Sequence, residues 1–476
     1  MQNGRVTIWK NSLFVFFSQT IRLLTNFFIG IGIARLYGPE AFGQFTIAFT
    51  VANICIAFAD FGFELLLTTE IAKNKKEAVL ITRKYLSMKL IFVGLSFLLM
   101  LIIPSFQIFS QNSRTLIYFL TLYVVFTTFS NFFYALFRGF EKFEYESKIS
   151  LITNLTLLIF LAIFGFLKTP LEYLMLLFVA ARFFGLLISI KTASLLIGAS
   201  IYKIDFTDWK NIIKQILIFG TYFLLGSLYF QLDTILLGVW KGDHAVGIYQ
   251  SAYKVMLLLL LIPDILRSSV LPFLSRLSIE NNEYWIRLSR LLYKLLLLTV
   301  LPISLVLFFY SEQIITLIFG YEQYSNAVPI LKIFSFIVLV RFVGDAFVSM
   351  IITSQRRIIL VVIVIIANVI SFIANYLLIP KYNLYGAAIG SLFVNIIVVI
   401  GYISAYYKSF FKWTLEVRNL AVLTFVLFLA FLIWYNNASL FILPIILLTY
   451  LLFALFIGLS KDDRKTIFSK LYFKGI

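Results

Sequence analysis

Six basic residues lie within segments that are otherwise apolar: Arg22, Arg182, Lys254, Arg267, Lys332 and Arg341. Where an apolar segment crosses a membrane, a charged side chain near its centre costs roughly 3 kcal/mol unless a partner, water or a ligand compensates it. Six such charges in one chain predict a hydrated interior cavity. These residues are therefore the first candidates for function.

Five acidic residues occupy the same segments: Asp60, Glu64, Asp233, Asp264 and Asp345. Local pairing explains some of them, because Asp264 with Arg267 and Arg341 with Asp345 are each one helical turn apart. Asp60 and Glu64 are also one turn apart, and two neighbouring carboxylates resist simultaneous ionisation. All five acids are candidates for ion coupling or gating, with H⁺ or Na⁺ as the coupling ion.

Arg22, Arg182 and Lys254 have no acidic residue three or four positions away. Arg22 shares a helical face with Gln19 and Asn26, a polar stripe that should line a cavity. A guanidinium group offers a fork of donors that matches phosphate oxygens, and an ammonium group acts as a point charge. With Arg341, these residues are the predicted substrate-binding cations. An interhelical pair of Arg22 with Asp60 or Glu64 is the structural alternative.

The elements that carry these residues are apolar runs of about 20 residues, long enough to cross a ~30 Å hydrocarbon layer as helices. Hydrophobic residues make up 61% of the 476 residues and charged residues 13%, so the predicted fold is an all-α integral membrane protein. Breaks at charged residues, Pro and Gly define about fourteen spans, near 12–36, 41–69, 85–104, 114–137, 149–167, 171–197, 212–239, 245–274, 291–310, 327–353, 358–379, 384–407, 417–435 and 439–459.

Loop charges predict the orientation of these spans. The termini and alternate loops hold most of the Lys and Arg residues, and the intervening loops hold only Arg35, Arg114, Lys168, Lys241 and Lys381. The positive-inside rule therefore places both termini in the cytoplasm. The net charge of +18 is spread among apolar runs, which predicts contact with membrane lipids and no nucleic-acid partner.

The sequence lacks the residues that several classes of function would need. One Cys and one His provide no metal site. A nucleotide-binding glycine loop, a nucleophile with its base and a soluble catalytic domain are missing too, so we expect no catalytic residues, no cofactor and no enzyme activity. The predicted process takes place within or across the bilayer.

An internal repeat is visible at an offset of 204 residues. The turn GPEAFGQFTIAF (38–49) matches GDHAVGIYQSAY (242–253), and the register continues from Asp60 to Asp264. Six spans separate the copies, so both halves enter the membrane in the same direction, with the interface between lobes as the expected substrate site. The predicted domains are an N-terminal lobe (1–200), a C-terminal lobe (201–410), and two further helices with a basic cytoplasmic tail (411–476).

Three segments resemble the polysaccharide-biosynthesis transporters of the multidrug/oligosaccharidyl-lipid/polysaccharide exporter superfamily, which include O-antigen and capsule-unit flippases. They are ARLYGPEAFGQF (34–45), QLDTILLG (231–238) with VGIYQSAYKV (246–255), and LIPKYNLYGAAIGS (378–391). The resemblance implies two six-helix lobes, like those of multidrug and toxic-compound extruders, in a bacterial inner membrane. It also implies that the protein flips undecaprenyl-pyrophosphate-linked oligosaccharides between leaflets, with a polysaccharide polymerase and glycosyltransferases as further partners.

Three alternatives stay open at this point. A lipid II flippase of peptidoglycan synthesis is a close alternative, which complementation of a depleted strain would separate. A drug or cation antiporter would favour an acidic, aromatic cavity, which the surplus of unpaired cations argues against. A membrane-embedded glycan polymerase would need a long external loop carrying catalytic residues, whereas the external loops here are short. The sugar composition, the coupling ion and the oligomeric state are not encoded in a recognisable pattern.

Overall fold

The computed structural model describes residues 2–167, 169–354, 356, 358–436 and 440–468, and nearly all of them are helical. The helices are α1 (Gln2–Asp60), α2 (Phe63–Lys73), α3 (Ala78–Ile102), α4 (Gln111–Gly139), α5 (Phe143–Phe166), α6 (Leu171–Ile197), α7 (Trp209–Leu259), α8 (Leu261–Glu280), α9 (Asn282–Phe309), α10 (Ser311–Phe319), α11 (Tyr321–Tyr324), α12 (Ala327–Thr353), α13 (Ile358–Ser404), α14 (Tyr407–Thr414), α15 (Val417–Tyr435), α16 (Leu443–Phe453) and α17 (Lys461–Phe468). The predicted all-α fold is confirmed.

The number of membrane-length helices agrees with the predicted spans once three long helices are divided. Ten helical segments of the described chain are long and apolar enough to cross a membrane, and Leu443–Gly458 is a shorter apolar helix. α1, α7 and α13 each contain one non-helical residue, at Gly38, Gly242 and Asn383. Each of these three helices carries two predicted spans, so about fourteen spans are accounted for.

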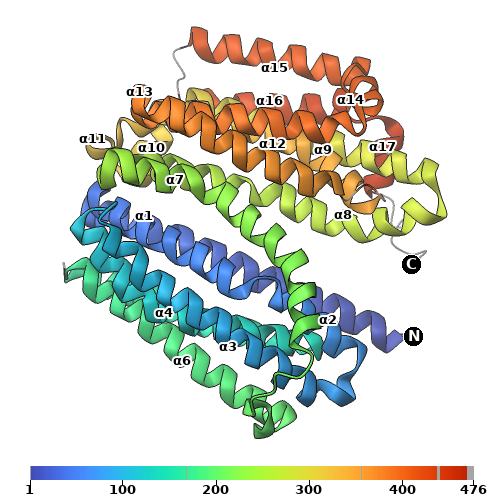
Figure 1. Cartoon of the computed structure of the whole chain (residues 1–476). Helices are drawn as coiled ribbons and strands as arrows, with labels where there is room; N and C mark the ends of the chain where they lie inside the picture. The colour runs from blue at the N-terminus through green and yellow to red at the C-terminus, as the bar shows by residue number, and fades with distance from the viewer. Residues whose placement is uncertain (1, 168, 355, 357, 437–439, 469–476) are drawn as a thin grey trace. The chain divides into compact units, whose positions relative to one another are not determined.

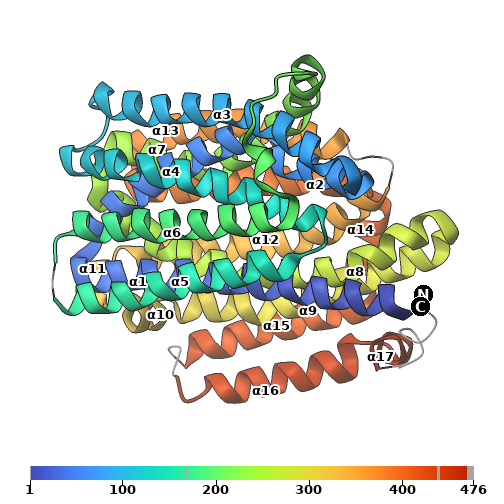
Figure 2. The same cartoon turned by 90° about the horizontal axis from the view of Figure 1, so that it is seen from below.

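The contacts divide the chain into two compact units. Unit 1 comprises Met1–Ser251 and Ile379–Leu384, and unit 2 comprises Ala252–Leu378 and Tyr385–Ile476. Within unit 1, α4 packs against α1 and α6 (Figure 1), and α5 packs against the same two helices. Within unit 2, α9 packs against α8 and α12, and α15 lies beside α16 (Figure 2). The predicted lobe boundaries at residues 200 and 410 stay a prediction.

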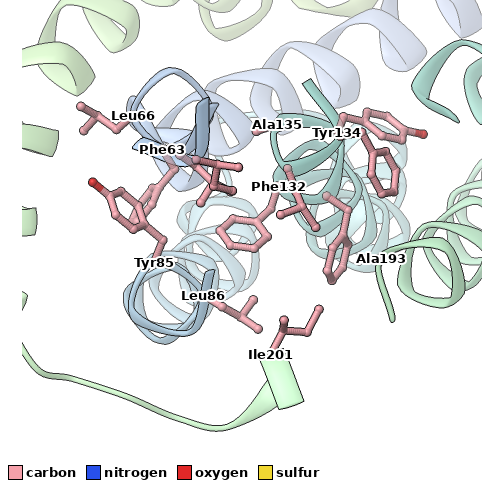
Figure 3. Close-up of a cluster of buried hydrophobic side chains, with 14 of the residues drawn as sticks. Phe63, Leu66, Tyr85, Leu86, Phe132, Tyr134, Ala135, Ala193 and Ile201 are labelled. Atoms are coloured by element: carbon pink, nitrogen blue, oxygen red, sulfur yellow. The ribbon is translucent and has the colours of Figure 1, made fainter. Parts of the chain in front are cut away.

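An aromatic core holds α2, α3 and α4 together in unit 1. Figure 3 shows Phe63, Tyr85 and Phe132 from these three helices converging with their neighbours. Between membrane helices, lipid is as apolar as the side chains, so close packing and small residues at the interface stabilise the contact. Gly139 provides such a contact, because a Cβ there would lie 2.8 Å from the Cβ of Ile71. The core thereby fixes the helices that carry Glu64, Lys89 and Arg138.

Two interruptions of predicted spans were not expected. The span expected at 245–274 is divided at Leu260 between α7 and α8. The span expected at 41–69 breaks after Asp60, where Phe61 and Gly62 adopt φ values of 25° and 81°. The left-handed conformation favours glycine, and α2 then begins at Phe63. The break leaves the last carbonyl groups of α1 without intrahelical donors. A polar partner is therefore needed at this point.

Candidate functional site

Arg182 lies near the middle of α6 in unit 1 and contacts the aromatic ring of Tyr123. Its guanidinium carbon is 5.6 Å from the ring centroid of Tyr123. Its Nε is buried without a hydrogen-bond acceptor, and none of the ion pairs within the described residues includes Arg182. A cation–π contact compensates a buried charge only in part, by ~1–2 kcal/mol. Arg182 therefore retains capacity to bind an anion.

Arg22 on α1 is close enough to Arg182 for the two charges to interact, and it also interacts with the charges of Glu64 and Glu146. Two cations held near one another favour an anion between them. Asn26, one turn further along α1, is exposed on the same helix. The side chain of Gln19, the third member of the predicted polar stripe, lies outside the described ones.

Arg138 at the end of α4 binds both acids of this region. Its Nε lies 2.7 Å from Oε2 of Glu146 and its Nη1 lies 3.2 Å from Oε2 of Glu64. A second bond to Glu146, 3.2 Å from Nη2 to Oε1, makes that pair bidentate. Arg138 thus binds both acids, and the set of three arginines and two glutamates keeps a positive surplus. Arg138 was predicted to lie in a loop, and its role here was missed.

Asp60 is already paired with a lysine. The ammonium group of Lys89 on α3, which is 0% exposed, binds the Asp60 carboxylate and donates to the carbonyl oxygen of Ala59 at 2.9 Å. The amide of Asn131 donates to the other Asp60 oxygen at 2.8 Å. Lys89 therefore compensates the polar groups at the break between α1 and α2. Lys89 was not predicted as a functional residue, although a lysine one turn inside an apolar span was a visible signal.

In unit 2, the predicted residues form one compact ionic group and one separate cation. Arg267 binds Asp264 one turn away, and its Nη1 lies 3.1 Å from Oδ1 of Asp345. Arg341 interacts electrostatically with Asp345. Lys254 is half-buried, and it has no hydrogen bond or ion pair among the residues that the structure describes. Like Arg182, Lys254 has no acid against it.

The remaining predicted acid, Asp233 on α7, accepts a hydrogen bond from the hydroxyl group of Tyr249 at 3.1 Å. Both residues belong to unit 1. Asp233 thus lies close to the second copy of the repeated turn. Its predicted gating or coupling role stays a prediction.

A family comparison agrees with the resemblance predicted from the sequence. Residues 8–278 match the model of the polysaccharide biosynthesis protein family, which is more than half of the chain. The chain belongs to this family. A curated relative of this family member is the capsular polysaccharide biosynthesis protein CapF of Staphylococcus aureus, 23% identical over 406 residues, which are 84% of this chain and 100% of the relative.

Solved structures of transporters share the fold of this family member. A lipid II flippase MurJ in an inward closed conformation matches with a TM-score of 0.73 and 16% identity, over 97% of this chain and 99% of that one. An inward-facing multidrug transporter of the MATE family matches with a TM-score of 0.66 and 17% identity, over 82% and 94%. The predicted resemblance and the MATE-like fold are confirmed. The chain is a multi-pass membrane protein with a transporter fold.

Proposed function

We propose that this protein is a flippase that moves undecaprenyl-pyrophosphate-linked oligosaccharide units, such as O-antigen, capsule or exopolysaccharide repeats, from the cytoplasmic to the outer leaflet of a bacterial inner membrane. The observation that carries the proposal is the proximity of Arg22 and Arg182 in unit 1, where Arg138 already occupies the nearby acids. A pyrophosphate supplies the anion that two such guanidinium groups favour.

The polar headgroup and the lipid tail need different environments. A pyrophosphate and its sugars need water and hydrogen-bond donors, whereas a polyprenyl chain is stable in the hydrocarbon layer. Arg22, Arg182, Lys254 and Arg341 would bind the headgroup in a wet cavity while the tail remains in lipid. The parallel repeat supports alternating access, in which two similarly oriented lobes rock about a central site. Both termini lie in the cytoplasm in this proposal.

The energy source is a second part of the proposal. The family match and the described charges support transport without nucleotide chemistry in this chain, so an H⁺ or Na⁺ gradient or downhill flow would drive it. Asp233, Asp264 and Asp345 are the acids proposed for coupling or gating. Asp60 and Glu64 are weaker candidates than the sequence indicated, because Lys89 and Arg138 bind them.

A lipid II flippase is the second candidate, favoured by the structural match to MurJ. Lipid II also carries a pyrophosphate on a polyprenyl tail, so the cations do not separate the two substrates. Complementation of a strain depleted of its lipid II flippase separates them. Growth on depletion would favour lipid II, whereas absence of growth together with restored glycan export would favour the oligosaccharide.

Charge reversal tests the proposed cation site. Arg22→Glu and Arg182→Glu should each reduce surface glycan about tenfold or more, because one charge-assisted hydrogen bond contributes ~1.5–3 kcal/mol. Lys191→Glu is the matched control, since Lys191 is an exposed cation on the same helix as Arg182. Surface glycan is measured against the amount of membrane protein. Full export by both arginine variants would contradict the assignment.

A further inference from the structure

The two copies of the repeated turn have the same backbone conformation. Gly38 has φ 83° and ψ 177°, and Gly242, 204 residues later, has φ 80° and ψ −178°. A non-glycine residue rarely adopts this conformation. Each glycine is followed directly by a helix that continues as a membrane span. The repeat seen in the sequence is therefore also a repeat of backbone conformation at these two glycines.

The two turns also contact each other in a symmetric way, and all the residues involved belong to unit 1. A Cβ at Gly43 would lie 2.6 Å from the carbonyl carbon of Asp243 and 3.0 Å from the nitrogen of Gly247. A Cβ at Gly247 would lie 2.7 Å from the carbonyl carbon of Pro39 and 3.2 Å from the nitrogen of Gly43. Gly43 corresponds to Gly247 and Pro39 to Asp243, so the contact is related to itself by a pseudo-two-fold axis.

Backbone contact of this kind requires glycine on both sides. Both distances to carbonyl carbons are shorter than any real Cβ contact, and the neighbouring atoms belong to the backbone, which cannot rotate away as a side chain can. We call this contact between residues 39–43 and 243–247 the glycine crossing. Its two sides come from segments that the loop charges place on the outer face of the membrane.

In the second copy of the turn, a buried carboxylate next to the glycine crossing is bound by the start of α4. The Asp243 carboxylate, whose residue is 7% exposed, accepts hydrogen bonds from the hydroxyl groups of Ser110 and Ser113, the latter at 2.8 Å. Ser110 is also the N-cap of α4. A carboxylate at the N-terminal end of a helix is stabilised by the helix dipole. The first copy has Pro39 at the equivalent position, so only the second turn provides this bond.

A segment of α13 that is predicted to be external contacts the second turn. The ammonium group of Lys241 lies 3.3 Å from the carbonyl oxygen of Pro380, in the part of α13 that belongs to unit 1. Segments around residues 39, 110, 242 and 380, all predicted to be external, thus meet in one cluster. Their bonds connect elements that are far apart in the chain. They can form only when these elements approach one another.

The geometry points to the glycine crossing as the outer gate of the transporter, closed by backbone contact at Gly43 and Gly247 and latched by Asp243 on Ser110 and Ser113. This inference rests on the alternating access in the proposed function. Opening separates the two turns and returns the Asp243 carboxylate to water, which solvates it well. The latch is therefore reversible, while the glycines set how closely the gate can shut.

A cysteine reporter can measure the state of this gate without any substrate. Thr46 lies one turn deeper than Gly43 on the same helix and is 7% exposed, and its hydroxyl group donates to the carbonyl oxygen of Phe42 in its own helix at 2.8 Å. Thr46→Cys in a Cys55→Ser background is treated in intact cells with a membrane-impermeant maleimide. The rate of labelling reports access from outside.

Gly43→Ala and Gly247→Ala should each raise the labelling rate about tenfold, equivalent to ~1.4 kcal/mol in favour of the open gate. Gly226→Ala is the matched control on the same helix as Gly247, because a Cβ at Gly226 meets nothing within 4 Å. Ser113→Ala removes one latch bond and keeps the backbone contact, so a smaller increase of about threefold is expected from one hydrogen bond.

The possible results distinguish a failure of the gate proposal from a failure of the proposed substrate. Unchanged labelling in both Gly43→Ala and Ser113→Ala, or an equal increase in Gly226→Ala, would overturn the gate. If the glycine variants fail to reach the membrane, Ser113→Ala alone decides in the same way. Increased labelling in a strain whose glycan export does not depend on this protein would support the gate and count against the proposed substrate.

Discussion

Asp60 and Asp264 occupy equivalent positions of the internal repeat, yet their exposure and their ion-pair partners differ. Asp60 has a side chain that is 15% exposed, and it binds the fully buried Lys89. Asp264 has a side chain that is 55% exposed, and it binds Arg267 one turn along its own helix. One acid thus needs a partner from another helix, and the other is compensated locally and by solvent.

The position of each acid relative to a helix break explains the difference. Asp60 is the last residue of α1, whereas Asp264 is in the first turn of α8. The partial charge of a helix is negative at its C-terminus and positive at its N-terminus, so it disfavours the first carboxylate and favours the second. Lys89 compensates both the carboxylate and the Ala59 carbonyl group. The repeat therefore conserves the position of an acid while the helix break decides how it is stabilised.

The largest expected effect is that of Lys89→Met. Removing one partner of a buried ion pair leaves an uncompensated charge, which lowers the free energy of unfolding by about 3–5 kcal/mol. We expect a large fall in the unfolding temperature of the purified protein and little protein in the membrane. The double variant Lys89→Met with Asp60→Asn removes both charges and should recover most of this loss. A stable single variant would contradict the role assigned to Lys89.

Arg267→Met is the matching change in the second half and should have a smaller effect. Arg267 is 28% exposed and Asp264 is more exposed still, and exposed pairs contribute about 0.2–1 kcal/mol. The loss of the 3.1 Å bond to Asp345 adds to this. We expect a fall in unfolding temperature well below that of Lys89→Met, measured in the same detergent. An equal fall in both variants would remove the distinction drawn between the two halves.

The helical plan was predictable from the sequence, because apolar runs and loop charges report on the membrane one segment at a time. The turns at Gly38 and Gly242 were predictable as well, since glycine is required there by backbone conformation. The break at Phe61–Gly62 was not predicted, because a single glycine in an apolar span is often tolerated. Lys89 was missed for a related reason, since its partner lies on another helix, 29 residues away.

The candidate site was predictable only in part. Arg182 stood out because no acid lies at helical spacing, and the described structure shows none bound to it. The partners of Arg138 lie 74 and 8 residues away, on helices that only the fold brings together. Helical spacing reveals local pairs such as Asp264 with Arg267. It does not reveal which cations are neutralised across helices, and hence which remain for a ligand.

A third ion pair allows the smallest and most selective test. Lys294 on α9 is 1% exposed, and its ammonium group lies 2.9 Å from Asp463 in the first turn of α17 and 3.9 Å from Glu416. The backbone amide of Ser460 also donates to Asp463, at 2.9 Å. Burial alone would raise the pKa of Asp463, but the bonds from Lys294 and Ser460 outweigh it and hold this pKa below its usual range. The predicted basic tail beyond this helix falls largely on residues 469–476, outside the described ones.

A lowered pKa stabilises the docked helix above the pKa of the free carboxyl group, near 4. That stabilisation is lost as the pH falls from about 4 through the lower pKa of the docked state. Hydrogen exchange of α17 should therefore accelerate below about pH 4 after correction for the intrinsic rate, and it should not do so to the same extent in Asp463→Asn. Because the acid is at a helix N-terminus and partly exposed, as Asp264 is, the change should be small compared with Lys89→Met. The same pH dependence in both proteins would show that the bond to Lys294 does not hold α17 in place.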